Sequence, residues 1–415
     1  MKRLFISLAI LAGISLSSCN DSFLEKTPVT DLTENNAFNS YDNFKAFMWP
    51  CYEMFTNNTI RTSLQGFGQD GQYKGDMAAG YFQQKYESGY NEFAYQTVAS
   101  VASGNGWDFK SFIRRVNIML SHIDNSSMTE AQKDHWRAVG YFFHSFWYME
   151  LIDRFGDVPW VDQVLQEDSP EAYGPRVDRK TVADKVLERL QWAEQNIGNF
   201  TSQDGDNTIN QDCVRAVISR FGLREGTWRK YHELGDAEKY LQECVRASEL
   251  LMAAYPTLYT GTDGQPGAGY GEMWTTEDLG QVPGIILYKS YVKDINPMGM
   301  SYIEHTSSHY VEMNQNTVDL YLMKNGKPIL ADGSGYHGNK DMYAVFRDRD
   351  PRLYQTVADS LRIMSAMGTN YTEGTSPTGY PTKKFLNDEW WVAGLDYCTG
   401  RLSPADAPCI RYAEV

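Results

Sequence analysis

The stretch from Thr129 to Pro159 decides the fold and reads TEAQKDHWRAVGYFFHSFWYMELIDRFGDVP. Residues 129–132 form a capping box, in which the Thr129 hydroxyl accepts a hydrogen bond from a free backbone N–H of the first turn. Gly156 and Pro159 end the helical pattern. The stretch therefore predicts one long helix. Its apolar stripe consists of Trp136, Val139, Phe143, Phe146, Trp147 and Leu151.

Further helices are predicted on both sides of this stretch. Apolar residues recur at helical spacing in residues 42–55, 107–123, 181–197, 211–225 and 236–254. Successive helices joined by short polar turns indicate stacked hairpins of tetratricopeptide-like length, although no strict repeat of about 34 residues is present.

The composition changes after Tyr255. Residues 256–405 are rich in Gly, Pro, Asn and Tyr, and only short runs such as 285–288 have strand character. We therefore predict a mainly α fold, with helical hairpins and binding loops over residues 19–255. A loop-rich second layer with short strands is predicted over residues 256–415.

The first 18 residues predict a lipoprotein signal peptide. Lys2 and Arg3 precede an apolar run over residues 4–16, which is too short to span a bilayer. Small residues then precede Cys19 in a pattern that resembles the bacterial lipobox. The alternative is an ordinary secretory signal with an incidental cysteine. We expect acylation of Cys19, for example with palmitate, and a mature protein held at the membrane through this lipid alone.

Charge and cysteine content exclude other classes of protein. The net charge of −15 repels a phosphate backbone, so nucleic acid is not an expected partner. Aromatic residues make up 13% of the chain, which requires a large core or an aromatic binding surface. No CxxC pair supports a zinc site. Cys398 and Cys409 flank a short loop, and they either form a disulfide or remain free thiols.

Six segments occur in one order along the chain, and together they resemble a known family. They are the mature start at Cys19, residues 107–117, the FGDVP end of the long helix, 347–352 with its RDPR sequence, 383–385, and RYAEV at 411–415. In this order they resemble the SusD/RagB family of outer-membrane nutrient-binding lipoproteins. The resemblance spans the whole chain. The family usually continues with further helical hairpins after RYAEV, so we expect this chain to be C-terminally truncated relative to its relatives.

The resemblance implies a function in polysaccharide utilisation. A non-catalytic lipoprotein on the outer face of the outer membrane captures oligo- or polysaccharide and delivers it to a TonB-dependent, SusC-like transporter. Glycan capture needs flat aromatic faces for sugar rings and polar side chains for the hydroxyls.

Aromatic residues in loops are the candidates for such a site. Trp107, beside Asn105 at a loop-to-helix junction, either presents its ring to solvent or anchors the helix. Trp274, near Tyr270 in a Gly-rich loop, is either a sugar platform or a packing residue between layers. Tyr73 and Asp76 either supply a polar edge to such a site or belong to an ordinary solvated loop.

Two other functions stay open on sequence grounds. A surface glycoside hydrolase needs only a pair of carboxylates, and Asp and Glu are plentiful. A tetratricopeptide-like array also suits peptides or glycopeptides. Residues 305–309 carry two histidines without the glutamate of HExxH, which favours incidental spacing. No cofactor is expected, although residues 204–207 are compatible with loosely bound calcium as an alternative to a polar loop.

Overall fold

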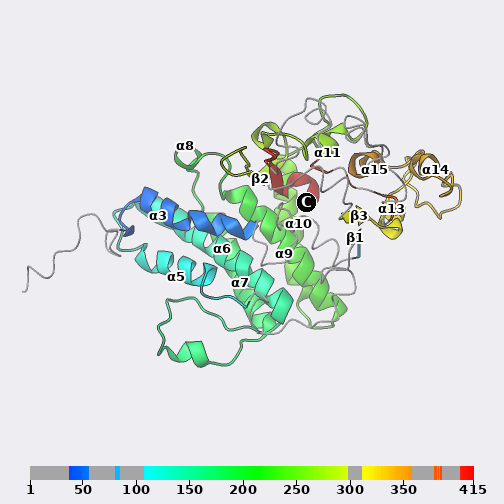
Figure 1. The fold of residues 1–415 in the computed structure, drawn as a ribbon. Helices are drawn as coiled ribbons and strands as arrows, with labels where there is room; N and C mark the ends of the chain where they lie inside the picture. Colours follow the sequence, from blue (N-terminus) through cyan, green and yellow to red (C-terminus); the bar gives the residue numbers. More distant parts are fainter. Residues whose placement is uncertain are drawn as a thin grey trace, which may run out of the picture.

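The structure is a computed structural model, and it describes residues 37–55, 80–84, 107–297, 311–357, 378–380, 382, 384–385 and 402–415. Figure 1 shows long helices on one side of the molecule and short helices and strands on the other. The fold is mainly α with few short strands, as predicted.

Helix α6 (Glu130–Phe155) is the long helix that the sequence predicts. The Thr129 and Gln132 side chains form the capping box with the backbone, and Gly156 ends the helix with φ of 68°. Apolar residues cover most of its circumference, because neighbouring helices surround it. Fifteen of its 26 residues are buried, so α6 is the central element of the helical core.

The other predicted helices are present with adjusted bounds. Residues 42–55 divide into α3 (Tyr41–Met48) and a 3₁₀ segment, Trp49–Phe55, because Pro50 lacks a backbone N–H. Helix α5 (Phe112–His122) begins later than predicted, since the Asp108 carboxylate accepts from the N–H groups of Lys110 and Ser111 and holds a turn there. The remaining long helices are α7 (Arg179–Asn196), α9 (Gln211–Tyr231) and α10 (Ala237–Ala254).

Short elements make up the rest of the described chain. The predicted strand at residues 285–288 is β2 (Ile285–Lys289), which pairs antiparallel with β4 (Ala407–Arg411). Arg411 therefore ends a strand, and Tyr412–Glu414 follows as a single 3₁₀ turn. The remaining short helices are α8 (Thr201–Asp204), α11 (Ala268–Glu272), α13 (Gln315–Leu320), α14 (Met342–Phe346) and α15 (Pro351–Thr356).

The sequence-based division at residue 255 stays a prediction, and both predicted regions share contacts. Strand β1 (Phe82–Gln84) pairs antiparallel with β3 (Val311–Met313) across that division. The Asn207 side chain forms two hydrogen bonds with the backbone of Tyr288, donating to its C=O at 2.9 Å and accepting from its N–H at 3.0 Å. These two hydrogen bonds hold the loop before α9 against strand β2.

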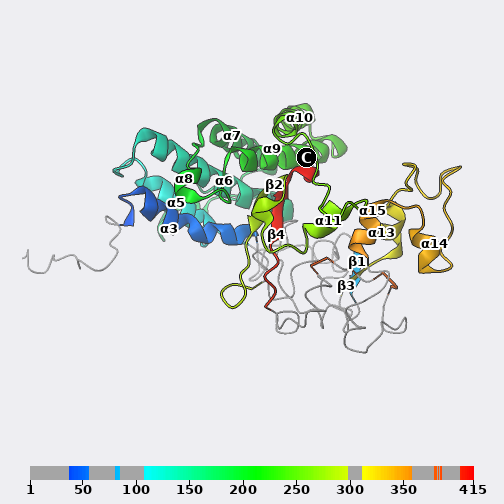
Figure 2. The same cartoon turned by 90° about the horizontal axis from the view of Figure 1, so that it is seen from above.

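Among the residues that the structure describes, buried side chains form one large core and two small ones. The large core lies among the long helices and also takes in Ile286, Leu287, Cys409 and Ile410 of the β2–β4 sheet. This sheet lies between the helices and α11 (Figure 2). The second core surrounds Trp274 and Phe385, and the third lies around Phe82 and Phe346.

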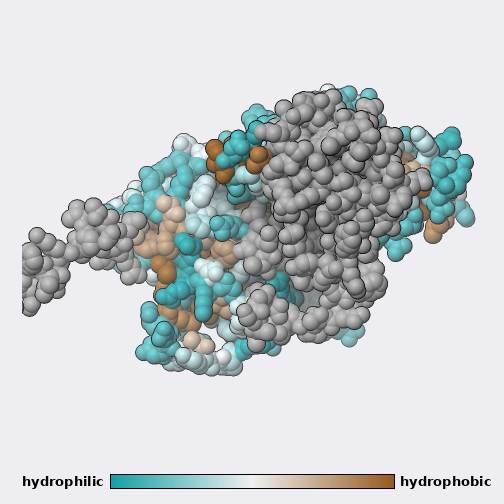
Figure 3. Space-filling view, in the orientation of Figure 1, coloured by the Kyte–Doolittle hydropathy of each residue, from teal (hydrophilic) through white to brown (hydrophobic). Residues whose placement is uncertain are grey.

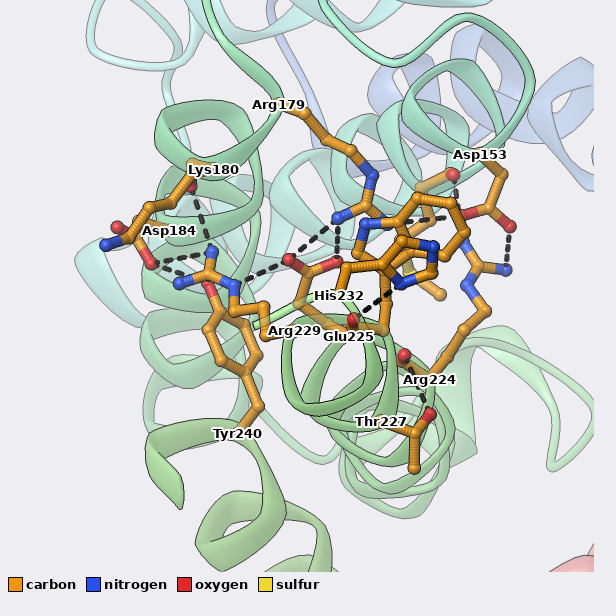
Figure 4. Close-up of polar contacts among 12 residues, drawn as sticks. Asp153, Arg179, Lys180, Asp184, Arg224, Glu225, Thr227, Arg229, His232 and Tyr240 are labelled. Carbon is orange, nitrogen blue, oxygen red and sulfur yellow. Dashed lines mark hydrogen bonds and ion pairs between the residues drawn. The ribbon is translucent and has the colours of Figure 1, made fainter. Parts of the chain in front are cut away.

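A network of buried charges joins α6, α7, α9 and α10 (Figure 4). Glu225 accepts from Nε of Arg229 at 2.7 Å, and both side chains are only 1% exposed. Arg179 reaches the other side of the same carboxylate at 2.6 Å. Arg229 also donates to Asp184 and to the Tyr240 hydroxyl. Because buried charges are stable only when they are paired, this network fixes the relative positions of the helices.

In the view of Figure 3 the described helical side is largely hydrophilic, with smaller hydrophobic groups among the polar ones. Within the described ranges, none of the helices combines the length and apolar character that crossing a bilayer requires. Cys409 is a buried free thiol, so it forms no disulfide with Cys398, which itself lies outside the described residues.

Candidate ligand-binding pocket

The pocket-forming region is built around helix α11 and two glycines. Gly267 precedes α11 with φ of 79°, and a Cβ there would lie 2.9 Å from Cβ of Pro351. At Gly269 a Cβ would lie 2.4 Å from the Tyr259 carbonyl oxygen. Glycine is therefore required at both positions, since it alone lets α11 pack directly on α15 and on the preceding loop.

A cavity of about 690 Å³ lies beside α11, within the size range of small-molecule sites. Residues far apart in the sequence meet there, from the loop before α11, from α15 and from the end of β4. The side chains that matter for ligand chemistry are Tyr259, Tyr270, Met273, Arg352, Arg411 and Tyr412. This lining combines aromatic rings with guanidinium groups, a composition that suits sugar rings and their polar substituents.

The predicted residues Tyr270 and Trp274 lie side by side near this cavity. Their ring centroids are 6.0 Å apart in an edge-to-face arrangement. Tyr270 lines the cavity, whereas Trp274 is only 7% exposed and packs edge-to-face on Phe385 at 5.3 Å. Trp274 therefore takes the packing position that the sequence left as one of its two alternatives. Its ring supports Tyr270 from the side of the second core.

Two cationic side chains stack on these rings. Nζ of Lys384 lies 4.3 Å from the Trp274 ring centroid, and the Arg411 guanidinium lies 5.2 Å from it. Such cation–π contacts stabilise a desolvated cation against an aromatic face. Burial alone would raise the pKa of the Tyr270 hydroxyl, but the charge and hydrogen bond of Lys384 and the charge of Arg411 outweigh it and lower this pKa.

The carboxylates near the cavity already have partners. Glu272 accepts from the Tyr259 hydroxyl at 2.6 Å and from the N–H of Thr262 at 2.8 Å. The first of these bonds raises the pKa of Tyr259 to about 12. Asp350 pairs with Arg352 at 2.5 Å.

The RDPR segment, residues 349–352, contains one ion pair and one buried arginine. Asp350 and Arg352 form the ion pair. Arg349, in contrast, is fully buried and donates to the carbonyl oxygens of Val345, Val318 and Tyr321. A buried guanidinium thus takes the place of ordinary turn hydrogen bonds, because the segment packs against α13 and α14 rather than lying in solvent.

The other predicted site residues lie elsewhere. Trp107 is half-buried and packs edge-to-face on Phe155 at 4.9 Å, with the Arg176 guanidinium 4.8 Å from its ring. It is not among the residues that line the cavity. Tyr73, Asp76 and Asn105 lie outside the described residues.

A second cavity, of about 440 Å³, lies at the loop that was compatible with calcium. Asp204 lines it, but its carboxylate is occupied by the Tyr41 hydroxyl and by Nζ of Lys45 at 3.3 Å. Asn207 is held by Tyr288. In the described part of the chain no three His, Cys, Asp or Glu side chains gather in a way that suits a metal ion.

Sequence reasoning did not single out Tyr259, Arg352, Arg411 or Tyr412 as site residues. The two arginines stand in the RDPR and RYAEV segments, which the sequence analysis used only as signatures of the family. Both arginines stand close to a tyrosine in the sequence, and Arg and Tyr together are frequent in binding sites. This pattern could have identified the two arginines as candidates.

Two family models match the chain. The model described as the SusD family matches residues 289–415. A SusD-like model described as starch-binding and associating with the outer membrane matches residues 22–223. No curated protein matches the chain.

Several solved structures have the same fold as this chain. A SusD-like protein from Bacteroides fragilis superposes with a TM-score of 0.67 at 17% identity, covering 94% of this chain and 76% of that one. A SusD-like carbohydrate binding protein from the same species gives 0.65 at 17% identity, covering 91% and 72%. A laminarin-binding SusD-like protein gives 0.58 at 16%, covering 91% and 78%. At these identities the likeness establishes the fold.

Proposed function

Because this chain belongs to the SusD/RagB family, we propose that it binds glycan in the cavity beside α11 and catalyses no reaction. The observation that carries the proposal is the lining of this cavity. Tyr259, Tyr270 and Tyr412 supply rings for the apolar faces of sugars, and Arg352 and Arg411 supply donors for their oxygens. Proteins of this family are glycan binders without catalytic activity, which supports the absence of a reaction.

Tyr270 is the residue that we place at the centre of the site. Trp274 supports its ring, and Lys384 and Arg411 orient it. Trp107 remains a second candidate, at a separate surface near the end of α6. Tyr73, Asp76 and Asn105 remain candidates as loop residues.

Association with the outer membrane follows from the family. We propose that acylated Cys19 provides the anchor, and that the bound glycan passes to a TonB-dependent, SusC-like transporter. The signal peptide and lipobox pattern of residues 1–19 support the anchor. Incorporation of labelled palmitate into the wild-type protein, and its loss in Cys19→Ser, is the result expected.

Titration of the purified protein with a panel of oligo- and polysaccharides tests the binding function. At least one glycan is expected to bind, and Tyr270→Ala is expected to weaken it about tenfold, as for a central tyrosine in an interface. Tyr343→Ala is the matched control, because this tyrosine is 88% exposed on α14 and lies outside the cavity.

Three outcomes would contradict the proposal in different ways. Absence of binding by a folded sample to every glycan would overturn the function. Glycan binding that is unaffected by Tyr270→Ala would move the site elsewhere. Release of reducing ends from a polysaccharide would favour the glycoside hydrolase, and preferential binding of peptides would favour the peptide-binding array.

A further inference from the structure

The charged side chains in the described lining of the cavity beside α11 are all positive. Arg352 and Arg411 line it, whereas its described lining contains no Asp or Glu. Lys384 lies directly behind Tyr270, with Nζ 5.6 Å from the centroid of that ring. The wall therefore brings three cationic groups to one place in a chain whose net charge is −15.

The neighbouring carboxylates do not neutralise all of this charge. Asp350 pairs with Arg352, and Glu272 is held by the Tyr259 hydroxyl and by backbone N–H groups. Among the described residues, the Arg411 guanidinium contacts the sulfur of Met273, at 3.3 Å, and the faces of Tyr270 and Trp274. Neither Arg411 nor Lys384 has an ion pair with any carboxylate in the described residues. Within the described residues, Arg411 at the cavity wall and Lys384 behind Tyr270 therefore have no opposite charge beside them.

From this arrangement we propose that the glycan taken by the cavity is acidic, with carboxylate or sulfate groups that pair with Arg411 and Arg352. The inference rests on the proposed glycan-binding function and names its substrate class. Guanidinium groups match the planar carboxylate and the sulfate oxygens, and they donate two hydrogen bonds at once. Tyr270 then contacts the ring that carries the acidic group.

The overall negative charge of the chain does not oppose such a ligand at close range. At physiological ionic strength, charges separated by more than about 8 Å are largely screened, so the local wall outweighs the distant surface. The lowered pKa of Tyr270 is consistent with a positive local potential, because Lys384 and Arg411 stabilise its anion despite burial.

A matched pair of probes separates charge from sugar recognition. The first probe is an oligogalacturonate, and the second is the same oligosaccharide after reduction of its carboxyl groups to hydroxymethyl groups. A second pair is a chondroitin sulfate oligosaccharide and its desulfated form. Isothermal titration of the full chain is expected to show at least one acidic probe binding about tenfold more tightly than its partner, as for one charge-assisted hydrogen bond.

Variants place this preference at the cavity. Arg411→Gln and, independently, Arg352→Gln are expected to remove most of the tenfold difference while leaving residual binding of the neutral probe. Arg347→Gln is the matched control, because that side chain is 68% exposed and lies outside the cavity lining. Circular dichroism melting identifies any variant that loses its fold. If Arg411→Gln unfolds the protein, Arg352→Gln still tests the inference, because the Arg352 side chain is 61% exposed.

The outcomes distinguish this inference from the function on which it rests. Equal or tighter binding of both neutral probes would overturn the acidic preference and leave glycan binding intact. A preference that survives in both folded arginine variants would overturn the role of this wall. Failure of the protein to bind any glycan in the wider panel would overturn the proposed function itself.

Discussion

The helical part and the region around α11 use opposite means to hold their side chains in place. Helix α6 and its neighbours bury one continuous apolar core, reinforced by the Glu225–Arg229 pair. The α11 region consists of helices of five or six residues and two small cores, joined by close contacts at glycine. Of the two cavities described above, the one at the helical part is about 440 Å³ and the one beside α11 is about 690 Å³. The difference shows why the candidate site lies among short elements that a rigid scaffold supports.

Removal of Glu225 is expected to destabilise the helical part more than any other substitution proposed here. In Glu225→Ala the Arg229 guanidinium, 1% exposed, loses its nearest carboxylate, and Arg179 loses its 2.6 Å partner. The free energy of unfolding is expected to fall by about 3–5 kcal/mol, the usual result of breaking a buried ion pair. Chemical denaturation measures it.

The control for Glu225 is an exposed ion pair. Glu130, whose side chain is 83% exposed, pairs with Lys133 at 3.0 Å. Glu130→Ala is expected to change the free energy of unfolding by less than about 1 kcal/mol. Equal effects of the two substitutions would show that the buried network does not hold the helices together.

Acid is expected to weaken the helical part through His135. This side chain is 3% exposed, and burial lowers its pKa from 6.5 to about 4 despite Asp204 and the Gly198 carbonyl. Between these values the unfolded chain binds more protons, so the contribution of His135 is complete above pH 6.5 and is lost as the pH falls toward 4. It amounts to at most about 3 kcal/mol.

Substitution of His135 makes this contribution measurable. His135→Gln keeps a donor for the Gly198 carbonyl and is expected to flatten the fall in unfolding free energy between pH 7 and pH 4. His232→Gln, at an exposed position on the same scaffold, is the control. Parallel pH profiles for wild type and His135→Gln would contradict the assignment.

The α11 region is expected to respond to pH in the opposite direction, through Asp406. This carboxylate is 1% exposed and accepts from the N–H groups of Leu279 and Tyr291. Burial raises its pKa from 3.8 to about 6. Here the folded chain binds more protons, so the favourable contribution is complete below pH 3.8 and is lost as the pH rises through 6, up to about 3 kcal/mol.

Hydrogen exchange measures the protection of individual backbone N–H groups, so it tests the α11 region separately from the helical part. Protection of the N–H groups of Leu279 and Tyr291 is expected to decrease between pH 4 and pH 6, after correction for the intrinsic exchange rate, and Asp406→Asn is expected to abolish this decrease. An unchanged pH dependence in Asp406→Asn would show that another group titrates there.

Local sequence signals predicted the helical part well. Thr129 and Gly156 define α6 because capping and helix termination depend on neighbouring residues. The extension of α9 to Tyr231 was missed, since it depends on tertiary contact. Gly222 and Gly226 let α10 approach so closely that a Cβ at Gly222 would lie 2.6 Å from the Tyr240 carbonyl oxygen. Such packing overrides the weak helix propensity of glycine.

The candidate pocket was predicted only in part. Tyr270 and Trp274 stand in a Gly-rich segment that the sequence analysis named either as a candidate site or as packing between layers. Arg352 and Arg411 reach the same cavity from positions far along the chain, through the packing of α15 and the pairing of β2 with β4. No local pattern specifies a meeting of this kind, because it depends on the register of strands that are more than a hundred residues apart.

Strand β4 has a consequence for the energetics of capture. Cys409 and Ile410 are embedded in the large helical core, and the next residue is Arg411. The backbone that carries this guanidinium is thereby immobilised before any sugar arrives. Most of the entropy lost on association then comes from the flexible oligosaccharide rather than from the polypeptide. The binding site is therefore preorganised and does not need to fold around its ligand.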